Sequence, residues 1–308
     1  MRDIIFALRR WLGRIHIGRW EDPRAWGAAT ENIARKWLRK MPVVPMTDQR
    51  FTLPERLRGE YRGGDVQGWQ HAALARACGI QEEAFSPEEL VGRAGEGTLP
   101  YGANIPGLRL VDTLWMACPG LFRSGERQAH MLAKRQLEEY LSRGLHPDTG
   151  LPAHAFGLES GAPLGVYGWG RGTAFLFLAL VESLPHADAE TRSWLLARAL
   201  TLAGILQKAQ LPDGGWGWLL FGGGPAESSA TAMLGTGFAL LAREAGWSDY
   251  ARVARDARSC LMGLTRRDGT VDYAQGDTRG IGMYSARREP LPLAQAYAVA
   301  LARLTADF

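Results

Sequence analysis

Cysteine is scarce in this chain, and its placement excludes two common uses of the residue. The 308 residues include three cysteines, an odd number, and Cys78, Cys118 and Cys260 lie far apart in apolar sequence. This spacing predicts neither a disulfide framework nor a set of zinc ligands. We therefore expect a cytoplasmic protein, because free thiols persist most simply in a reducing compartment. We also expect that the protein holds no metal and no cofactor.

Linkers, low-complexity tracts and dense clusters of one charge are also missing. The net charge is +4 with a pI near 9.1, and the basic residues are spread along the chain, which disfavours nucleic acid as a partner and leaves a small acidic ligand compatible. Apolar residues make up 46% of the sequence, enough to fill one large core. Residues 1–308 are expected to form a single domain. The sequence does not predict the oligomeric state.

The first twenty residues contain too many charges for a signal peptide or a membrane span. Arg9, Arg10 and Arg14 interrupt the apolar run, and no cleavage site of small residues follows. Apolar side chains still recur on one helical face, so residues 1–20 are predicted to form an amphipathic helix. That helix is expected either to pack against a neighbouring helix or to lie on an anionic membrane surface.

Two kinds of helical segment alternate along the rest of the chain. Nearly continuous apolar sequence predicts helices that are buried on every side, over 66–78, 110–118, 171–184, 227–243 and 290–304. Amphipathic sequence predicts an outer layer, over 24–40, 86–92, 125–143, 188–208 and 248–264. Six hairpins of about fifty residues each would account for the whole length. The predicted fold is therefore all-α, an (α/α)6 toroid.

Three loops between these helices share one local pattern. Each makes a turn with an aspartate and a glycine, which supply a side-chain cap and a positive φ, and the loops cover 146–154, 212–218 and 267–273. Short strand-like pieces lie in or beside them, around 151–156, 216–221 and 270–273. In a toroid such loops and the starts of the inner helices converge, and helix amino termini favour anionic groups there.

Three charged residues are expected at this convergence. Asp112 lies in an otherwise apolar helix, where burial is costly unless the carboxylate caps a loop or has a function. Arg171 is flanked by glycines and Trp169, and its guanidinium could bind both oxygens of a sugar carboxylate or form a salt bridge that ties two loops, for example to Glu227. Glu227 itself stands where a helix cap is the commoner role.

Three segments that contain these residues resemble glycoside hydrolase families 88 and 105, the unsaturated glucuronyl and unsaturated rhamnogalacturonyl hydrolases. They are Leu-Val-Asp-Thr-Leu-Trp-Met-Ala-Cys-Pro-Gly-Leu at 110–121, Trp-Gly-Arg-Gly at 169–172 and Glu-Ser-Ser-Ala-Thr-Ala-Met at 227–233. The resemblance covers roughly residues 60–305. It implies a six-hairpin toroid that removes an unsaturated uronic acid from the non-reducing end of acidic oligosaccharides produced by lyases.

The chemistry that the resemblance implies is hydration of a vinyl ether. One carboxyl group protonates C4 of the C4=C5 bond and then assists water at C5, instead of the two flanking carboxylates of ordinary glycosidases. By the same resemblance Asp112 lines the site, Arg171 positions the uronate and His154 contributes to the pocket. The expected acid/base aspartate is replaced by Gly157, and the nearest carboxylate is Glu159. Either Asp112 or Glu159 then has the acid/base role, or the chain binds saccharide without reaction.

Aromatic residues complete the predicted site and leave other functions open. Tyr167 and three tryptophans, Trp169, Trp216 and Trp218, are candidate sugar-binding residues, although loop packing would explain the tryptophans equally well. A non-catalytic saccharide-binding or exopolysaccharide-assembly protein is the main alternative. Residues 210–216 also resemble the Gln-Trp repeat of triterpene cyclases, but the chain shows one copy and no Asp-x-Asp-Asp acid, so an isoprenoid cyclase is less favoured.

Overall fold

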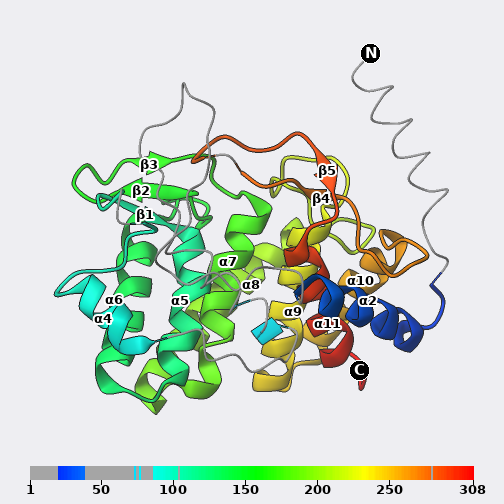
Figure 1. The fold of residues 1–308 in the computed structure, drawn as a ribbon, viewed down its shortest axis with the longest axis horizontal. Coiled ribbons are helices and arrows are strands. Elements are labelled where there is room, and N and C mark those ends of the chain that lie inside the picture. Colours follow the sequence, from blue (N-terminus) through cyan, green and yellow to red (C-terminus); the bar gives the residue numbers. More distant parts are fainter. Residues whose placement is uncertain (1–19, 39–72, 74–75, 78–85, 103–104, 279) are drawn as a thin grey trace.

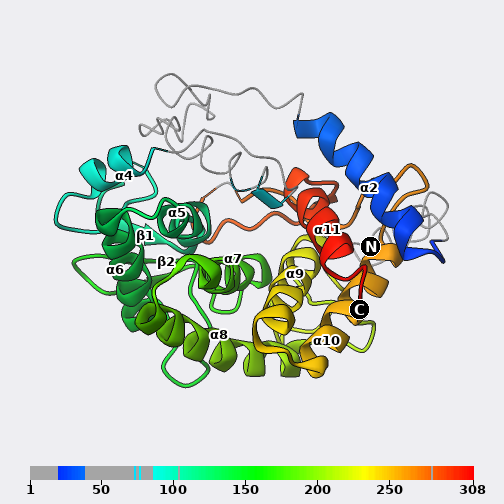
Figure 2. The same cartoon turned by 90° about the horizontal axis from the view of Figure 1, so that it is seen from below.

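The chain forms a ring of paired helices (Figure 2). A computed structural model describes residues 20–38, 73, 76–77, 86–102, 105–278 and 280–308. The inner helices are α5 (Val111–Arg123), α7 (Gly170–Val181), α9 (Ser228–Ala245) and α11 (Pro292–Leu304). The outer helices are α2 (Pro23–Leu38), α4 (Pro87–Ala94), α6 (Arg127–Arg143), α8 (Ala189–Ala209) and α10 (Ser248–Gly263). The prediction of an all-α toroid is confirmed.

Three of the inner helices, α5, α7 and α9, each contact their own outer helix and the next inner helix. α5 packs on α6 and α7, α7 on α8 and α9, and α9 on α10 and α11, while α11 packs on α2 from the other end of the chain. Every residue of α7 is buried, as its apolar sequence predicted. Close approach of α7 and α9 requires Gly237, because a Cβ there would lie 2.5 Å from the ring of Phe177.

The predicted helix positions agree with the structure except at some ends. α5 begins after a short strand and continues through Pro119 to Arg123, five residues past the predicted end. Of the predicted inner helix at 66–78, the structure describes Ala73, Arg76 and Ala77, and these are helical. The amphipathic helix predicted for residues 1–20 lies outside the described residues, apart from Trp20.

Five short strands of the described chain lie at one end of the ring, beside the starts of the inner helices (Figure 1). β1 (Leu108–Leu110), β2 (Ala155–Gly157) and β3 (Pro163–Leu164) form an antiparallel sheet in that order. β4 (Ala274–Gln275) and β5 (Arg288–Glu289) form an antiparallel ribbon. We call this end of the ring the mouth.

Of the three predicted strand-like pieces, the first overlaps β2, and the other two contain isolated bridges from Leu219 to Trp169 and from Val271 to Thr265. No helix within the described ranges is long and apolar enough to span a bilayer.

Candidate active site

The starts of three inner helices bring the predicted charged residues to the mouth. Asp112 lies in the first turn of α5, Arg171 follows the first residue of α7, and Glu227 is the N-cap of α9. Their exposed fractions are 9%, 3% and 1%. The predicted acid and the predicted guanidinium therefore lie at the same end of the molecule.

Strands β1 and β2 hold Asp112 beside His154. Leu110 pairs with Ala155, and the Val111 amide donates to the His154 carbonyl at 3.0 Å. Because both side chains adjoin this pairing, Oδ2 of Asp112 lies 3.5 Å from Nε2 of His154. That separation is an ion-pair distance whenever the imidazole is protonated.

Two atoms of this pair are buried without a hydrogen-bond partner among the described residues, Oδ2 of Asp112 and Nδ1 of His154. Leaving a buried polar group unsatisfied costs about 1–3 kcal/mol, and such groups in folded proteins need a specific explanation. A carboxyl oxygen that no protein donor occupies can give a proton to a bound molecule and take one back. The pair is therefore the best candidate for chemistry at the mouth.

Tyr284, which the sequence did not indicate, packs beside His154. Its ring centroid lies 5.6 Å from that of His154, 5.3 Å from that of Trp169 and 5.9 Å from that of Trp218. Its hydroxyl accepts a hydrogen bond of 3.0 Å from the Val166 amide. The segment between β4 and β5 thus supplies an aromatic wall of the site.

The two tyrosines whose pKa the charge of Asp112 raises keep their protons at neutral pH. Burial raises the pKa of Tyr140 well above its usual value, and the charge of Asp112 adds to this effect. Burial also raises the pKa of Tyr284, against the lowering effect of the hydrogen bond from Val166. The Tyr140 hydroxyl is occupied, since it donates to the Ala153 carbonyl at 2.6 Å. Neither phenol competes with Asp112 as a base.

Arg171 is occupied by the protein itself. Nη1 donates to the Gln275 carbonyl at 2.7 Å and to Oγ of Ser229 at 3.4 Å, and Nη2 donates to the Gly276 carbonyl at 3.2 Å. The guanidinium also lies 5.1 Å from the ring centroid of Trp169. These contacts fix strand β4 over the start of α7, so Arg171 has a positioning role in this structure.

Glu227 is saturated in the same way. Its carboxylate accepts hydrogen bonds from the amides of Ser229, Ala230 and Gln275 and from the Ser229 hydroxyl. It therefore caps α9 and anchors β4, the role that the sequence favoured for it. The direct salt bridge with Arg171 that the sequence allowed is not formed between these two described residues, and Ser229 links them instead.

Trp216 is a core residue, which favours the packing role over the sugar-binding role that was also predicted for it. Its exposed fraction is 0%, and its indole N–H donates to the Leu206 carbonyl at 2.8 Å. Its ring stacks on that of Phe238 at a centroid distance of 5.7 Å. Trp169 is also buried, with its indole N–H held by Oε1 of Gln275 at 2.8 Å. Packing explains both rings.

Trp218 and Tyr167 are better placed to meet a ligand. Trp218 is half-buried and packs against Tyr284. Tyr167 is also half-buried, and its ring meets that of His146 edge-on at 4.8 Å. Both roles remain predictions.

Glu159 lies away from Asp112, the other residue that the sequence offered for the acid/base role. It is exposed in the turn between β2 and β3. Ala155 adjoins the start of α5, and β2 carries the chain about 10 Å from there to that turn. The structure therefore does not support Glu159 as the acid/base residue.

The sequence does not indicate two of the site residues, Tyr284 and Gln275. Gln275 is buried and bridges the site, because it accepts from Trp169 and donates to the Ser285 carbonyl. Both lie after the third Asp-Gly loop, in sequence with no helical or alternating periodicity. No local signal identifies them.

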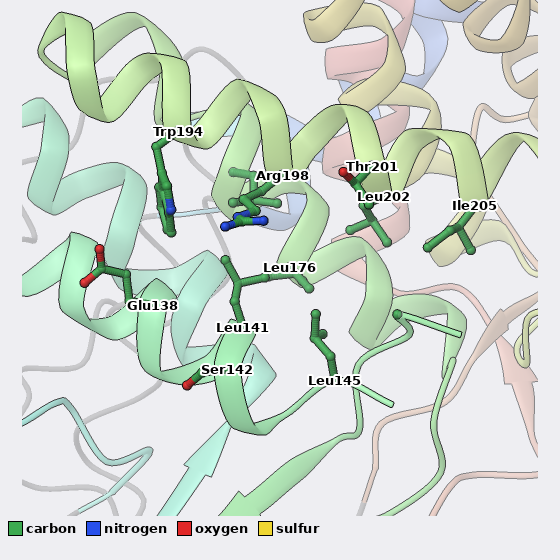
Figure 3. Close-up of a pocket in the computed structure, with 12 residues that line it drawn as sticks. Glu138, Leu141, Ser142, Leu145, Leu176, Trp194, Arg198, Thr201, Leu202 and Ile205 are labelled. Atoms are coloured by element: carbon green, nitrogen blue, oxygen red, sulfur yellow. The ribbon is translucent and has the colours of Figure 1, made fainter. Parts of the chain in front are cut away.

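One cavity of the described chain lies outside this site. A cavity of about 320 Å³ opens between α6, α7 and α8, where Trp194 and Arg198 of α8 face Glu138 and Leu141 of α6 (Figure 3). It belongs to the packing of neighbouring hairpins. Within the described residues, no three histidine, cysteine or acidic side chains gather as metal ligands.

Comparison with known sequences gives one family. A sequence model of Glycosyl Hydrolase Family 88 matches residues 92–306, well over half of the chain. No curated protein matches the chain in sequence.

Solved structures show the same fold at low identity. A possible member of glycoside hydrolase family 105 from Klebsiella pneumoniae is 21% identical, with a TM-score of 0.64 over 72% of this chain and 65% of that chain. A similar protein from Salmonella enterica is 18% identical, with a TM-score of 0.68 over 92% of this chain and 83% of that one. The unsaturated glucuronyl hydrolase of Bacillus sp. GL1 is 20% identical, with a TM-score of 0.55 over 77% and 72% of the two chains.

Proposed function

Because the chain belongs to glycosyl hydrolase family 88, we propose that it removes an unsaturated uronic acid from the non-reducing end of acidic oligosaccharides. The Bacillus sp. GL1 protein of this fold is an unsaturated glucuronyl hydrolase responsible for the degradation of glycosaminoglycan. The observation that carries the proposal is the buried Asp112 carboxyl, with an oxygen that no described protein donor occupies, beside His154 at the mouth.

Asp112 is the proposed acid/base residue. Its carboxyl proton passes to C4 of the sugar, and the positive charge that develops at C5 is shared with the ring oxygen. Water adds at C5 and gives a proton to the Asp112 carboxylate, which restores the acid. The hemiketal then opens between C5 and the ring oxygen, and the hemiacetal left at C1 expels the neighbouring sugar. One carboxyl group suffices for this sequence, so Gly157 does not prevent it.

His154 positions Asp112, and aromatic rings shape the space around it. Nε2 of His154 lies at ion-pair distance from Asp112, so the imidazole can stabilise the carboxylate that forms when the proton leaves. The half-buried rings of Tyr284 and Trp218 offer apolar faces to a sugar. Arg171 and Glu227 act through strand β4, which they hold in place.

The cytoplasm remains the proposed location. Cys118 and Cys260 are free thiols, and Cys118 is buried, which supports a reducing compartment. Contact of the amphipathic residues 1–20 with a membrane stays a prediction.

The direct test follows the absorbance of the unsaturated uronate with disaccharides made by lyases from pectin and from glycosaminoglycans. We expect the absorbance to decay with at least one of them, because hydration removes the C4=C5 bond. If no disaccharide is consumed while several raise the melting temperature, the chain is a saccharide-binding protein, and the proposed hydrolysis is wrong.

A further inference from the structure

Arg288 brings a second guanidinium to the mouth, and the proposed reaction does not use it. In the β4–β5 ribbon it pairs directly with Gln275. Directly opposed residues of an antiparallel pair project to the same face. The Gln275 side chain accepts the indole hydrogen bond of Trp169, so this face of the ribbon is turned toward the site. Arg288 therefore projects to the Trp169 side of the mouth.

The charge of Arg288 is not neutralised at close range. Within the described part of the chain the guanidinium makes one weak hydrogen bond, of 3.4 Å to the Arg287 carbonyl, and no carboxylate lies at ion-pair distance. Burial lowers the pKa of Arg288, the charge of Glu227 raises it and that of Arg171 lowers it. The guanidinium nevertheless stays charged at neutral pH.

The two charged groups that affect the pKa of Arg288, those of Glu227 and Arg171, are hydrogen-bonded to other residues. Both carboxylate oxygens of Glu227 accept hydrogen bonds from Ser229, Ala230 and Gln275. Arg171 donates to the carbonyls of β4 and of Gly276. Arg288 is thus a half-buried cation on the face of the ribbon that Gln275 shares, and no carboxylate among the described residues pairs with it. A guanidinium in this state suits an anion that presents two oxygens.

We infer that Arg288 binds an anionic group, a carboxylate or a sulfate, of the oligosaccharide that the mouth accepts. This inference rests on the proposed function, since it concerns the same site. It gives Arg288 the anion-binding role that the sequence assigned to Arg171, whose guanidinium holds β4. The anion is either the carboxylate of the uronic acid itself or a charged group on the neighbouring sugar.

The test uses three variants and two classes of substrate. Arg288→Gln removes the charge, Arg288→Lys keeps the charge without the planar donors, and Arg287→Gln is the matched control. Arg287 is exposed, and successive side chains of a strand alternate between faces. The substrates are unsaturated disaccharides whose neighbouring sugar is neutral in one class and sulfated or carboxylated in the other.

We expect Arg288→Gln to raise KM roughly 10- to 100-fold with kcat little changed, the loss of a charge-assisted contact. Arg288→Lys should lie between Arg288→Gln and the wild type, and the salt dependence of KM should fall in Arg288→Gln. An equal rise with both classes identifies the uronate carboxylate as the anion. A rise confined to the charged class identifies the neighbouring sugar. If Arg288→Gln matches Arg287→Gln with every substrate, the inference is wrong.

Calorimetric binding separates this inference from the proposed hydrolysis. If the wild type binds the disaccharides without consuming them, and Arg288→Gln weakens binding by a similar factor, the hydrolysis fails and the anion site stands. If the wild type consumes the disaccharides and Arg288→Gln leaves turnover unchanged, the hydrolysis stands and the anion site is overturned. If the wild type neither binds nor consumes any of them, both are overturned. Should Arg288→Gln fail to fold, the rise in KM of Arg288→Lys decides.

Discussion

The buried charged residues on the two sides of the mouth differ in how fully they are hydrogen-bonded. On the α5 side, Oδ2 of Asp112 and Nδ1 of His154 are buried without a hydrogen-bond partner in the described structure. On the α9 side, Glu227 accepts hydrogen bonds from three backbone amides and a hydroxyl. Arg171, on the helix between them, donates to the carbonyls of Gln275 in β4 and of Gly276.

We interpret this difference as one between a residue that meets the substrate and residues that hold the loops in place. A buried charge that is fully hydrogen-bonded stabilises the loop that it touches, and its removal leaves several donors or acceptors unsatisfied. A buried polar atom without a partner contributes nothing to folding and costs free energy. Its retention is explained when a bound substrate supplies the missing contact. Glu227 belongs to the first kind and Asp112 to the second.

The substitution Asp112→Asn tests most directly whether Asp112 acts in the reaction. The amide keeps the shape of the side chain but cannot deliver a proton, so we expect kcat to fall by roughly 100- to 10,000-fold. The melting temperature should change little, because the carboxyl makes few contacts that the amide would lose. Turnover follows from the absorbance assay and stability from a thermal melt. Unchanged turnover would remove Asp112 from the mechanism.

Glu227→Gln should give the opposite pattern. The neutral amide cannot accept all the hydrogen bonds that the carboxylate accepts, so the free energy of unfolding should fall by about 2–4 kcal/mol. The matched control is Asp188→Asn, which alters an exposed N-cap that accepts from Thr191 at the start of α8, and its effect should be smaller. Urea denaturation measures both. If Glu227→Gln abolished turnover in a protein of wild-type stability, Glu227 would belong to the catalytic side.

Helix positions were predictable because the signal for them is local. The all-apolar sequence of α7 required burial on every side whatever its neighbours were, and the structure buries every residue of that helix. The strands are two or three residues long, too short for an alternating pattern to develop. β1 was accordingly assigned in part to the helix that follows it.

The site was predictable where a residue conflicts with its surroundings. Asp112 stands out because it is charged inside an apolar helix. Tyr284 does not stand out, because its contact with Val166 spans 118 residues of sequence and depends on how one loop lies over another. Trp216 is the opposite case, a residue that stands out in the sequence but lies in the core. Its sequence neighbourhood does not reveal that α8 supplies an acceptor for its indole. Which of several aromatic residues faces a ligand is a tertiary property.

Of the three carboxylate substitutions, Glu159→Gln should have the smallest effect. It serves as a reference, because Glu159 lies outside the two sides compared. Glu159 is the carboxylate nearest in sequence to Gly157, but its side chain is exposed in the β2–β3 turn, where water solvates it and no described element confines it. We expect kcat/KM to stay within about twofold of the wild type, as for most exposed substitutions. The absorbance assay that tests Asp112→Asn measures it under the same conditions. A fall comparable with that of Asp112→Asn would mean that the turn folds over the mouth during turnover, and the unsatisfied carboxyl of Asp112 would then need a different explanation.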